Sequence, residues 1–313
     1  MNVFIAGGSG AIGRLLVPLL VKDGHNVVAL TRSADGEAQL AQMGAVAVVG
    51  DVYDEARLAR FVAESQAEVV IHQLTAFNAK QGDPYAETIR VRIDGTRSLI
   101  AAARAAGARR FIAQSISFMC SPSGSGLTDE ETPLYLDSPP AVRALAEAVA
   151  SLERQTMDCG MSGTVLRYGW FYGPGTSYDP QGAIPTAIRK GTMPIVGEGA
   201  GTYSFINLQD AAAATVHALA HEASGIYNIV DDSPVRFSEW LPFAARLLDA
   251  PAPGHVDETR ARQKVGDLRV YYMNEQRGAS NAKAKREFGW QPAFPSWRAG
   301  FEALYSNRRS ATK

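Results

Sequence analysis

Short apolar segments alternate with longer alanine- and leucine-rich segments through the first half of the chain. The apolar segments are continuous rather than alternating, which predicts strands buried on both faces. They are Asn2–Ala6, Asn26–Leu30, Val46–Val49, Glu68–His72, Arg109–Gln114 and Gly163–Arg167. The segments between them predict helices at Ile12–Lys22, Gly36–Gln42, Asp54–Glu64, Ala86–Ala106 and Pro140–Asp158. This alternation predicts right-handed βαβ crossovers and a Rossmann-type α/β fold with a doubly wound parallel sheet.

The pattern changes after Arg167. Gly173–Tyr203 is rich in glycine and proline and predicts only short elements. The later segments predict a strand at Ile226–Val230, a charged stretch at Asp257–Arg269, and helices at Leu208–His221, Ser238–Leu248, Asn281–Phe288 and Trp297–Tyr305. We therefore expect a dinucleotide-binding domain over residues 1–168, with contributions from 205–230, and a smaller α/β substrate lobe, mainly 169–313.

Composition narrows the possible partners. The 313 residues are 46% apolar and carry 31 basic against 32 acidic side chains, a formal net charge of −1. The apolar fraction excludes wholesale disorder. The near-equal numbers of basic and acidic side chains argue against a nucleic-acid or anionic-membrane partner. No apolar run reaches the ~18 residues of a membrane span, and no targeting segment is visible. Cys120 and Cys159 cannot form a disulfide framework, so we expect a cytoplasmic protein.

No metal site is expected. His217 and His221 are spaced i, i+4 on one predicted helix, a spacing that can bind a metal ion. No third ligand follows at a telling distance, so a solvated or packed pair is the better interpretation.

A glycine-rich turn joins the first predicted strand to the first helix. It reads Gly7-Gly8-Ser9-Gly10-Ala11-Ile12-Gly13. Glycine at its start permits a tight turn, in its middle a close approach of amides to a pyrophosphate, and at its end close helix packing. The alternative is a turn that binds nothing. The strand–turn–helix context favours cofactor binding by Gly7, Ser9, Gly10, Ala11, Ile12 and Gly13.

The end of the second strand bears on which nicotinamide cofactor is used. NAD sites usually carry an acid here, whereas this chain has Arg32, which can pair with a 2′-phosphate. Arg14 can add a second charge. We expect NADP(H) to be preferred, with NAD(H) possible; otherwise Arg32 is a solvated surface residue. Asp51 and Val52, after the third strand, are candidates to contact the adenine.

Further motifs follow in a fixed order over nearly the whole chain. They include Gly50-Asp51-Val52, Val70-Ile71-His72, Asp94-Gly95-Thr96, Leu166-Arg167-Tyr168-Gly169, Tyr172-Gly173-Pro174-Gly175, Phe205-Ile206-Asn207-Leu208-Gln209-Asp210 and Glu287-Phe288-Gly289-Trp290. In this series the chain resembles the extended short-chain dehydrogenase/reductase family, the NAD(P)-dependent epimerase/dehydratases. The resemblance implies a Rossmann domain, a C-terminal substrate lobe, and Leu74, Thr75, Ala76 and Tyr168 near the nicotinamide half of the cofactor.

The chain departs from this family at the proton donor. Members usually carry Tyr-x-x-x-Lys, in which the tyrosine moves the substrate proton and the lysine lowers its pKa. Here these positions are Pro139 and Arg143, or Pro140 and Ala144 in the neighbouring register. No Tyr-x-x-x-Lys occurs anywhere in the chain.

Three further departures concern the substrate. Positions where the family often has Asn, Asn and Arg carry Arg92, Trp170 and Tyr203. The last two losses remove a polar contact and a phosphate-binding cation, which weakens the case for a nucleotide sugar. Aromatic residues from Tyr168 to Tyr178 suit an apolar or aromatic substrate, or form ordinary core.

Five residues are candidates for the remaining chemistry. Ser115 and Ser117 follow the fifth strand and can hydrogen-bond a substrate oxygen, or else cap the strand end. The phenol of Tyr168, or that of Tyr172, can replace the missing acid, although packing is the commoner role. Arg143 can hold ribose hydroxyls and lower a neighbouring phenol's pKa, but cannot itself be an acid near neutral pH.

We therefore expect an NAD(P)-dependent oxidoreductase that acts on a small organic carbonyl, alcohol or enone with a non-standard proton donor. The alternatives are a nucleotide-sugar-type epimerase/dehydratase and a catalytically silent NADP-binding sensor. A small-molecule substrate is the expected partner. A homodimer through the helices predicted at Ala86–Ala106 and Pro140–Asp158 is possible.

Overall fold

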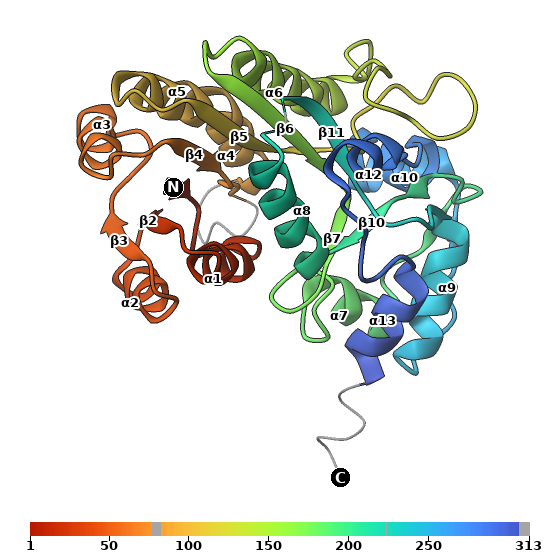
Figure 1. Ribbon diagram of the computed structural model, residues 1–313. Coiled ribbons are helices and arrows are strands. Elements are labelled where there is room, and N and C mark those ends of the chain that lie inside the picture. The colour runs from red at the N-terminus through yellow and green to blue at the C-terminus, as the bar shows by residue number, and fades with distance from the viewer. Residues whose placement is uncertain (77–82, 223, 307–313) are drawn as a thin grey trace.

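The computed structural model describes residues 1–76, 83–222 and 224–306. Its centre is a seven-stranded parallel sheet in the order β11-β6-β5-β4-β1-β2-β3 (Figure 1). The strands are β1 (Asn2–Ala6), β2 (Asn26–Thr31), β3 (Val46–Val49), β4 (Val69–His72), β5 (Arg110–Ile116), β6 (Ser162–Tyr168) and β11 (Gly225–Ile229). The strand order reverses direction at β1, so the predicted doubly wound α/β fold is confirmed.

Helices cover both faces of this sheet (Figure 1). One face packs against α1 (Gly13–Lys22), α2 (Ala34–Gln42), α8 (Leu208–Ala220) and α12 (Ala282–Phe288). The other packs against α3 (Glu55–Glu64), α5 (Thr96–Ala105) and α6 (Pro140–Met157). All four residues of β4 and all seven of β5 are buried, as the continuous apolar pattern predicts for central parallel strands.

The helix predicted at Ala86–Ala106 is helical throughout but is not one regular α-helix. It consists of α4 (Pro84–Arg90), a π-helical segment η1 (Val91–Gly95) and α5. A second π-helical segment, η2 (Tyr271–Glu275), follows α11 (Asp267–Val270) near the C-terminus. Such segments are rare and occur frequently at functional sites, because they redirect side chains from the regular helical face.

A second apolar core lies beyond the carboxyl ends of the parallel strands, and most of its residues come from the chain after β6. It is built from short strands and helices: β7 (Trp170–Tyr172), α7 (Ala183–Arg189), β8 (Ile195–Val196), β9 (Thr202–Tyr203), β10 (Phe205–Asn207), β12 (Val235–Arg236), α9 (Phe237–Leu247), β13 (His255–Val256), α10 (Glu258–Val265) and α13 (Trp297–Ser306). Phe205, Trp240 and Phe301 are fully buried at its centre. This core gives the molecule a wall opposite the strand ends.

Candidate cofactor and substrate site

A cavity of about 700 Å³ runs along the carboxyl ends of the parallel strands. We refer to it as the main cavity. Its walls include the residues that follow β1, β2, β3 and β4 on one side and the second apolar core on the other. Ligands of open α/β sheets bind in this position, at the point where the strand order reverses.

The glycine turn forms one end of the main cavity. Gly7 has φ of +95°, and a Cβ there would lie 2.7 Å from the Gln73 carbonyl oxygen. A Cβ on Gly13 would lie 2.3 Å from the Gly8 carbonyl oxygen. No side chain fits at either position, so the amides at the start of α1 stay open to the cavity. This geometry fits the pyrophosphate of a dinucleotide.

The predicted adenosine-binding residues also line the main cavity. They are Arg32 after β2, and Asp51 and Val52 after β3. Arg32 is exposed, and Val52 is buried. Ser9 of the glycine turn and Thr31 share a hydrogen bond of 3.2 Å between their hydroxyls, which ties the turn to the end of β2. The structure thus brings Arg32 and the glycine turn to one cavity.

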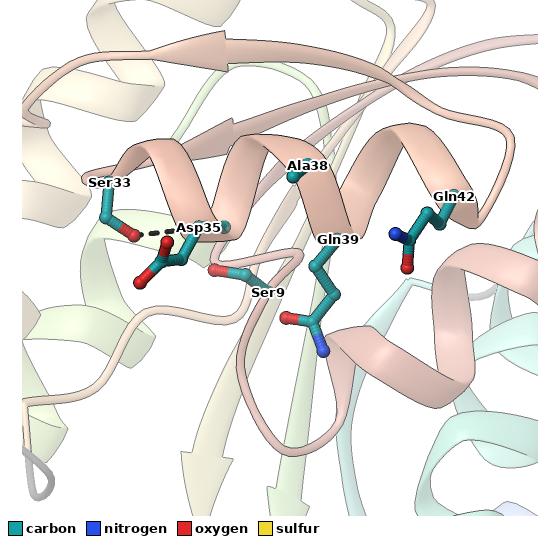
Figure 2. Close-up of a pocket in the computed structure, with 7 residues that line it drawn as sticks. Ser9, Ser33, Asp35, Ala38, Gln39 and Gln42 are labelled. Carbon is teal, nitrogen blue, oxygen red and sulfur yellow. Dashed lines mark hydrogen bonds between the residues drawn. The ribbon is translucent and has the colours of Figure 1, made fainter.

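A shallower pocket of about 500 Å³ adjoins this end, along α2 (Figure 2). Its polar side chains are Ser9, Ser33, Asp35, Gln39 and Gln42. Figure 2 shows Ser9, Ser33 and Asp35 grouped at the first turn of α2. The Ser33 hydroxyl accepts a hydrogen bond from the Gly36 amide at 3.1 Å and caps the helix.

The residues after β4 continue the wall toward the substrate lobe. Leu74, Thr75 and Ala76 all line the main cavity, next to the glycine turn. The His72 ring fixes this bend, since its Nδ1 accepts from the Leu74 amide at 3.2 Å and its Nε2 pairs with the Thr96 hydroxyl at 3.1 Å. Burial lowers the pKa of His72 to about 3, so the ring is neutral and structural.

Neither predicted serine faces the main cavity. The Ser115 hydroxyl donates a 2.8 Å hydrogen bond to Glu153, and Ser117 is buried away from the wall. The wall instead carries Gln114, Ile116 and Phe118. Side chains alternate along a strand, so the two sets necessarily point to opposite sides. β5 therefore offers the cavity the amide of Gln114 and the apolar side chain of Ile116, and Phe118 follows just after the strand.

Tyr168 and Arg143 are also placed elsewhere. The Thr215 hydroxyl donates to the Ala211 carbonyl, so the Tyr168 hydroxyl donates its own proton to Thr215 at 2.6 Å. Burial raises the pKa of Tyr168 to about 12. Arg143 is exposed on α6 and does not line the main cavity. These two residues, the two serines and the buried Tyr172 are the predicted site residues that the structure does not bring together with the others.

Four aromatic side chains form one wall of the main cavity, which we call the aromatic wall: Phe118, Trp170, Tyr203 and Tyr272. Phe118 stacks on Trp170 with ring centres 4.1 Å apart, and Trp170 stacks on Tyr203 at 5.2 Å. Tyr272 meets Trp170 edge-on at 4.9 Å. The Tyr271 hydroxyl donates to the Phe118 and Cys120 carbonyl oxygens, which holds the chain behind this wall in place.

Arg92 lies on the same cavity as a buried cation. It belongs to η1 and is 2% exposed, and it interacts electrostatically with Tyr272 and Glu153. Its departure from the family pattern was visible in the sequence, like those of Trp170 and Tyr203. Arg269 and Tyr272 also line the cavity but carried no sequence signal. Arg269 ends the charged stretch predicted at Asp257–Arg269, and Tyr272 follows where the sequence predicts no element.

Two features are absent from the described residues. Among the described residues, no group of three or more His, Cys, Asp or Glu side chains is placed to hold a metal ion. His217 and His221 instead stack on each other with ring centres 6.0 Å apart. Within the same part of the chain, every helix is too short or too polar to cross a membrane.

Comparison with known proteins agrees with this geometry. The model of the NAD dependent epimerase/dehydratase family matches residues 3–230. A Streptomyces protein named 3-diazoavenalumate denitrifying reductase is 41% identical over 96% of this chain and 99% of its own. The 2-alkyl-3-oxoalkanoate reductase of Stenotrophomonas maltophilia is 30% identical over 93% and 95%.

The fold is similar to that of dTDP-glucose 4,6-dehydratase from Streptomyces venezuelae, a structure solved with NAD bound. The TM-score is 0.77 at 21% identity, over 99% of this chain and 97% of that one. The family match covers most of the sheet and the whole glycine turn. The chain belongs to the NAD dependent epimerase/dehydratase family.

Proposed function

We propose that this chain is an NADPH-dependent reductase that adds hydride to a small aromatic substrate without a Tyr-x-x-x-Lys acid. One observation carries the proposal: where the family has its proton donor, this chain has Pro139 and Arg143, and Arg143 is exposed outside the main cavity. A reaction that needs hydride but no positioned acid is compatible with that replacement.

The proposed cofactor contacts follow from the walls of the main cavity. Gly7, Ser9, Gly10, Ala11, Ile12 and Gly13 would bind the pyrophosphate through the turn and the start of α1. Asp51 and Val52 would border the adenine, and Leu74, Thr75 and Ala76 the nicotinamide half. Bound NADPH would supply the hydride.

A preference for NADP(H) over NAD(H) rests on Arg32. It lies at the end of β2, lines the main cavity, and stands where an NAD site would usually have an acid for the ribose 2′-hydroxyl. A guanidinium binds a phosphate through charge-assisted hydrogen bonds, whereas it gains little from a hydroxyl. The hydroxyls of Ser9 and Ser33 in the adjoining pocket are further candidate partners for the 2′-phosphate.

The reaction we favour is the reductive removal of nitrogen from an aromatic diazo compound. The Streptomyces relative is named for a diazo substrate and for denitrifying reduction, and it matches this chain over almost its full length. Hydride addition to the terminal nitrogen of an aryl diazonium ion gives a neutral diazene. Loss of N₂ from that diazene leaves the arene, and no net proton is consumed.

Carbonyl reduction is the second candidate, supported by the Stenotrophomonas relative, which is named as a reductase of an oxoalkanoate. Hydride addition to a carbonyl carbon leaves an alkoxide, which needs a proton. The described cavity wall includes the phenols of Tyr53, Tyr85, Tyr178, Tyr203 and Tyr272. Burial raises the pKa of Tyr53, Tyr178, Tyr203 and Tyr272, so these four are weak acids near neutral pH.

The test is a substrate panel with purified protein and NADPH. The diazonium salt of 3-amino-4-hydroxybenzoate, an aryl ketone and a nucleotide sugar are each incubated with NADPH, and absorbance of the reduced cofactor is followed. NADPH oxidation with the diazonium salt, and with neither of the other two compounds, supports the proposal. Oxidation with the ketone supports the second candidate instead. Sugar conversion without net oxidation indicates an epimerase, and tight NADPH binding without any turnover indicates a sensor.

A further inference from the structure

Arg92 is a cation that the described protein leaves without a counter-ion. It is 2% exposed, and its Nη1 is buried with no hydrogen-bond partner among the described residues. The acid that acts on it electrostatically, Glu153, already accepts hydrogen bonds from Arg167 and Ser115. Burial lowers the pKa of Arg92 to about 10, so it stays charged at neutral pH. A buried, unpaired charge is costly, and a bound anion would relieve that cost.

The aromatic wall lies beside this cation. Tyr272 connects the aromatic wall to Arg92. It lines the main cavity, packs edge-on against Trp170, and lies within electrostatic reach of Arg92. Phe118, Trp170 and Tyr203 present stacked rings along the same wall. Because these rings stack on one another, a planar aromatic ring would add edge-to-face and stacking contacts to the cluster that a sugar ring cannot make.

Both π-helical segments contribute to this corner of the cavity. η1 carries Val91 and Arg92 to the wall, and η2 carries Tyr272 and Met273. Arg262 fixes the end of η2 by donating to Glu275 at 2.5 Å and also bonds Glu258 and Asp267. Two irregular turns from distant parts of the chain therefore converge on one cation and one aromatic face, as expected for a built binding site.

We infer that Arg92 and the aromatic wall bind a planar aromatic acid, with the ring against the wall and its anionic oxygen on the Arg92 guanidinium. The inference deepens the proposed function by naming its substrate class. Three of the contributing residues, Arg92, Trp170 and Tyr203, are positions where the chain departs from the family pattern. Two of these replacements, Trp170 and Tyr203, weaken a nucleotide-sugar site, and together with Arg92 they would form a site for an aryl carboxylate or phenolate.

Calorimetric titration of the NADP⁺-loaded protein tests this inference. The probes are cinnamate, methyl cinnamate and methyl 4-hydroxycinnamate, the last measured above and below the pKa of its phenol. We expect cinnamate to bind about tenfold or more tightly than its uncharged ester, because only the acid pairs with the guanidinium. If the phenolate is the recognised anion, the hydroxylated ester binds more tightly above its phenol pKa. No preference for an anion in either comparison overturns the inference, and this arm needs no variant.

The Arg92→Met variant supplies the second arm, since methionine keeps much of the volume without the charge. The anion preference should fall to about onefold, while NADP⁺ affinity stays within about twofold. Arg97→Met is the matched control, because Arg97 is an exposed arginine on the adjoining α5. An anion preference that survives in Arg92→Met also overturns the inference. Failure of the diazonium assay with an intact anion preference would refute the proposed reaction but not this site.

Discussion

Glu153 of α6 and Arg167 of β6 form a buried bidentate ion pair, with Nε and Nη2 of the arginine each 2.7 Å from a carboxylate oxygen. Both side chains are almost fully buried. The pair holds α6 to the sheet below the main cavity, and Ser115 completes it with a third hydrogen bond. It explains why Ser115 is structural rather than available to a substrate.

Replacing Glu153 with Gln should therefore destabilise the fold. Arg167 would keep its charge in a buried site without a counter-ion, which costs about 3 kcal/mol of unfolding free energy or more. Urea denaturation of Glu153→Gln measures the change. Glu147→Gln, on the exposed face of the same helix, is the control and should stay within about 0.5 kcal/mol of the wild type. Equal stability of both variants would show that the pair contributes nothing.

Two glycines of the glycine turn should differ in what an alanine substitution disrupts: Gly13 the fold, and Gly10 cofactor binding alone. A Cβ at Gly13 would overlap the Gly8 carbonyl, so Gly13→Ala should lower the melting temperature and abolish NADPH binding. A Cβ at Gly10 meets only the Gly7 carbonyl, at 3.1 Å, and lies on the cavity side. Gly10→Ala should keep its melting temperature but bind NADPH about tenfold more weakly. Unchanged NADPH affinity in Gly10→Ala would argue against a pyrophosphate at the turn.

Arg32 should decide between the two nicotinamide cofactors. Arg32→Ala removes the charge that would pair with the 2′-phosphate, so we expect NADPH affinity to fall about tenfold or more. NADH lacks this phosphate, and its affinity should change by less than about twofold. Fluorescence titration of both cofactors gives the ratio. If the affinities for NADPH and NADH fall equally, Arg32 stabilises the site but does not bind the 2′-phosphate.

Tyr168 should prove dispensable for catalysis. Its hydroxyl donates to Thr215, lies outside the main cavity, and has a pKa raised to about 12 by burial, so it does not ionise near neutral pH. Tyr168→Phe should cost about 1 kcal/mol of stability through the lost hydrogen bond. The rate constant kcat should stay within about threefold of the wild type between pH 6 and 9. A large loss of kcat with intact stability would restore Tyr168 as the acid.

The sheet and the glycine turn could be predicted because their signals are local. Continuous apolar runs separated by helical segments predict buried parallel strands. The glycines from Gly7 to Gly13 indicate a tight turn and a close approach of the backbone. The boundaries of β1 and β3 agree with the sequence interpretation. The side of the main cavity proposed for the cofactor could also be predicted, since the ends of parallel strands necessarily meet at one edge of the sheet.

The substrate side depended on information that is not local. β5 extends to Ile116, and the alternation of its side chains turns Gln114 and Ile116, rather than Ser115, toward the cavity. The π-helical turns at Arg92 and Tyr272 arise from tertiary packing, which no periodicity of the sequence reveals. Arg92, Trp170 and Tyr203 could be recognised as departures from a family pattern, but their convergence on one wall required the fold.

The most direct test of hydride transfer without a tyrosine acid is to count products. The ¹⁵N-labelled diazonium salt of 3-amino-4-hydroxybenzoate is mixed with the protein and a limiting amount of NADPH, and labelled nitrogen gas is measured by mass spectrometry against oxidised cofactor. We expect one molecule of nitrogen and one of 4-hydroxybenzoate for each NADPH oxidised. Nitrogen release that does not depend on NADPH, or NADPH oxidation without nitrogen release, would contradict the proposed reaction.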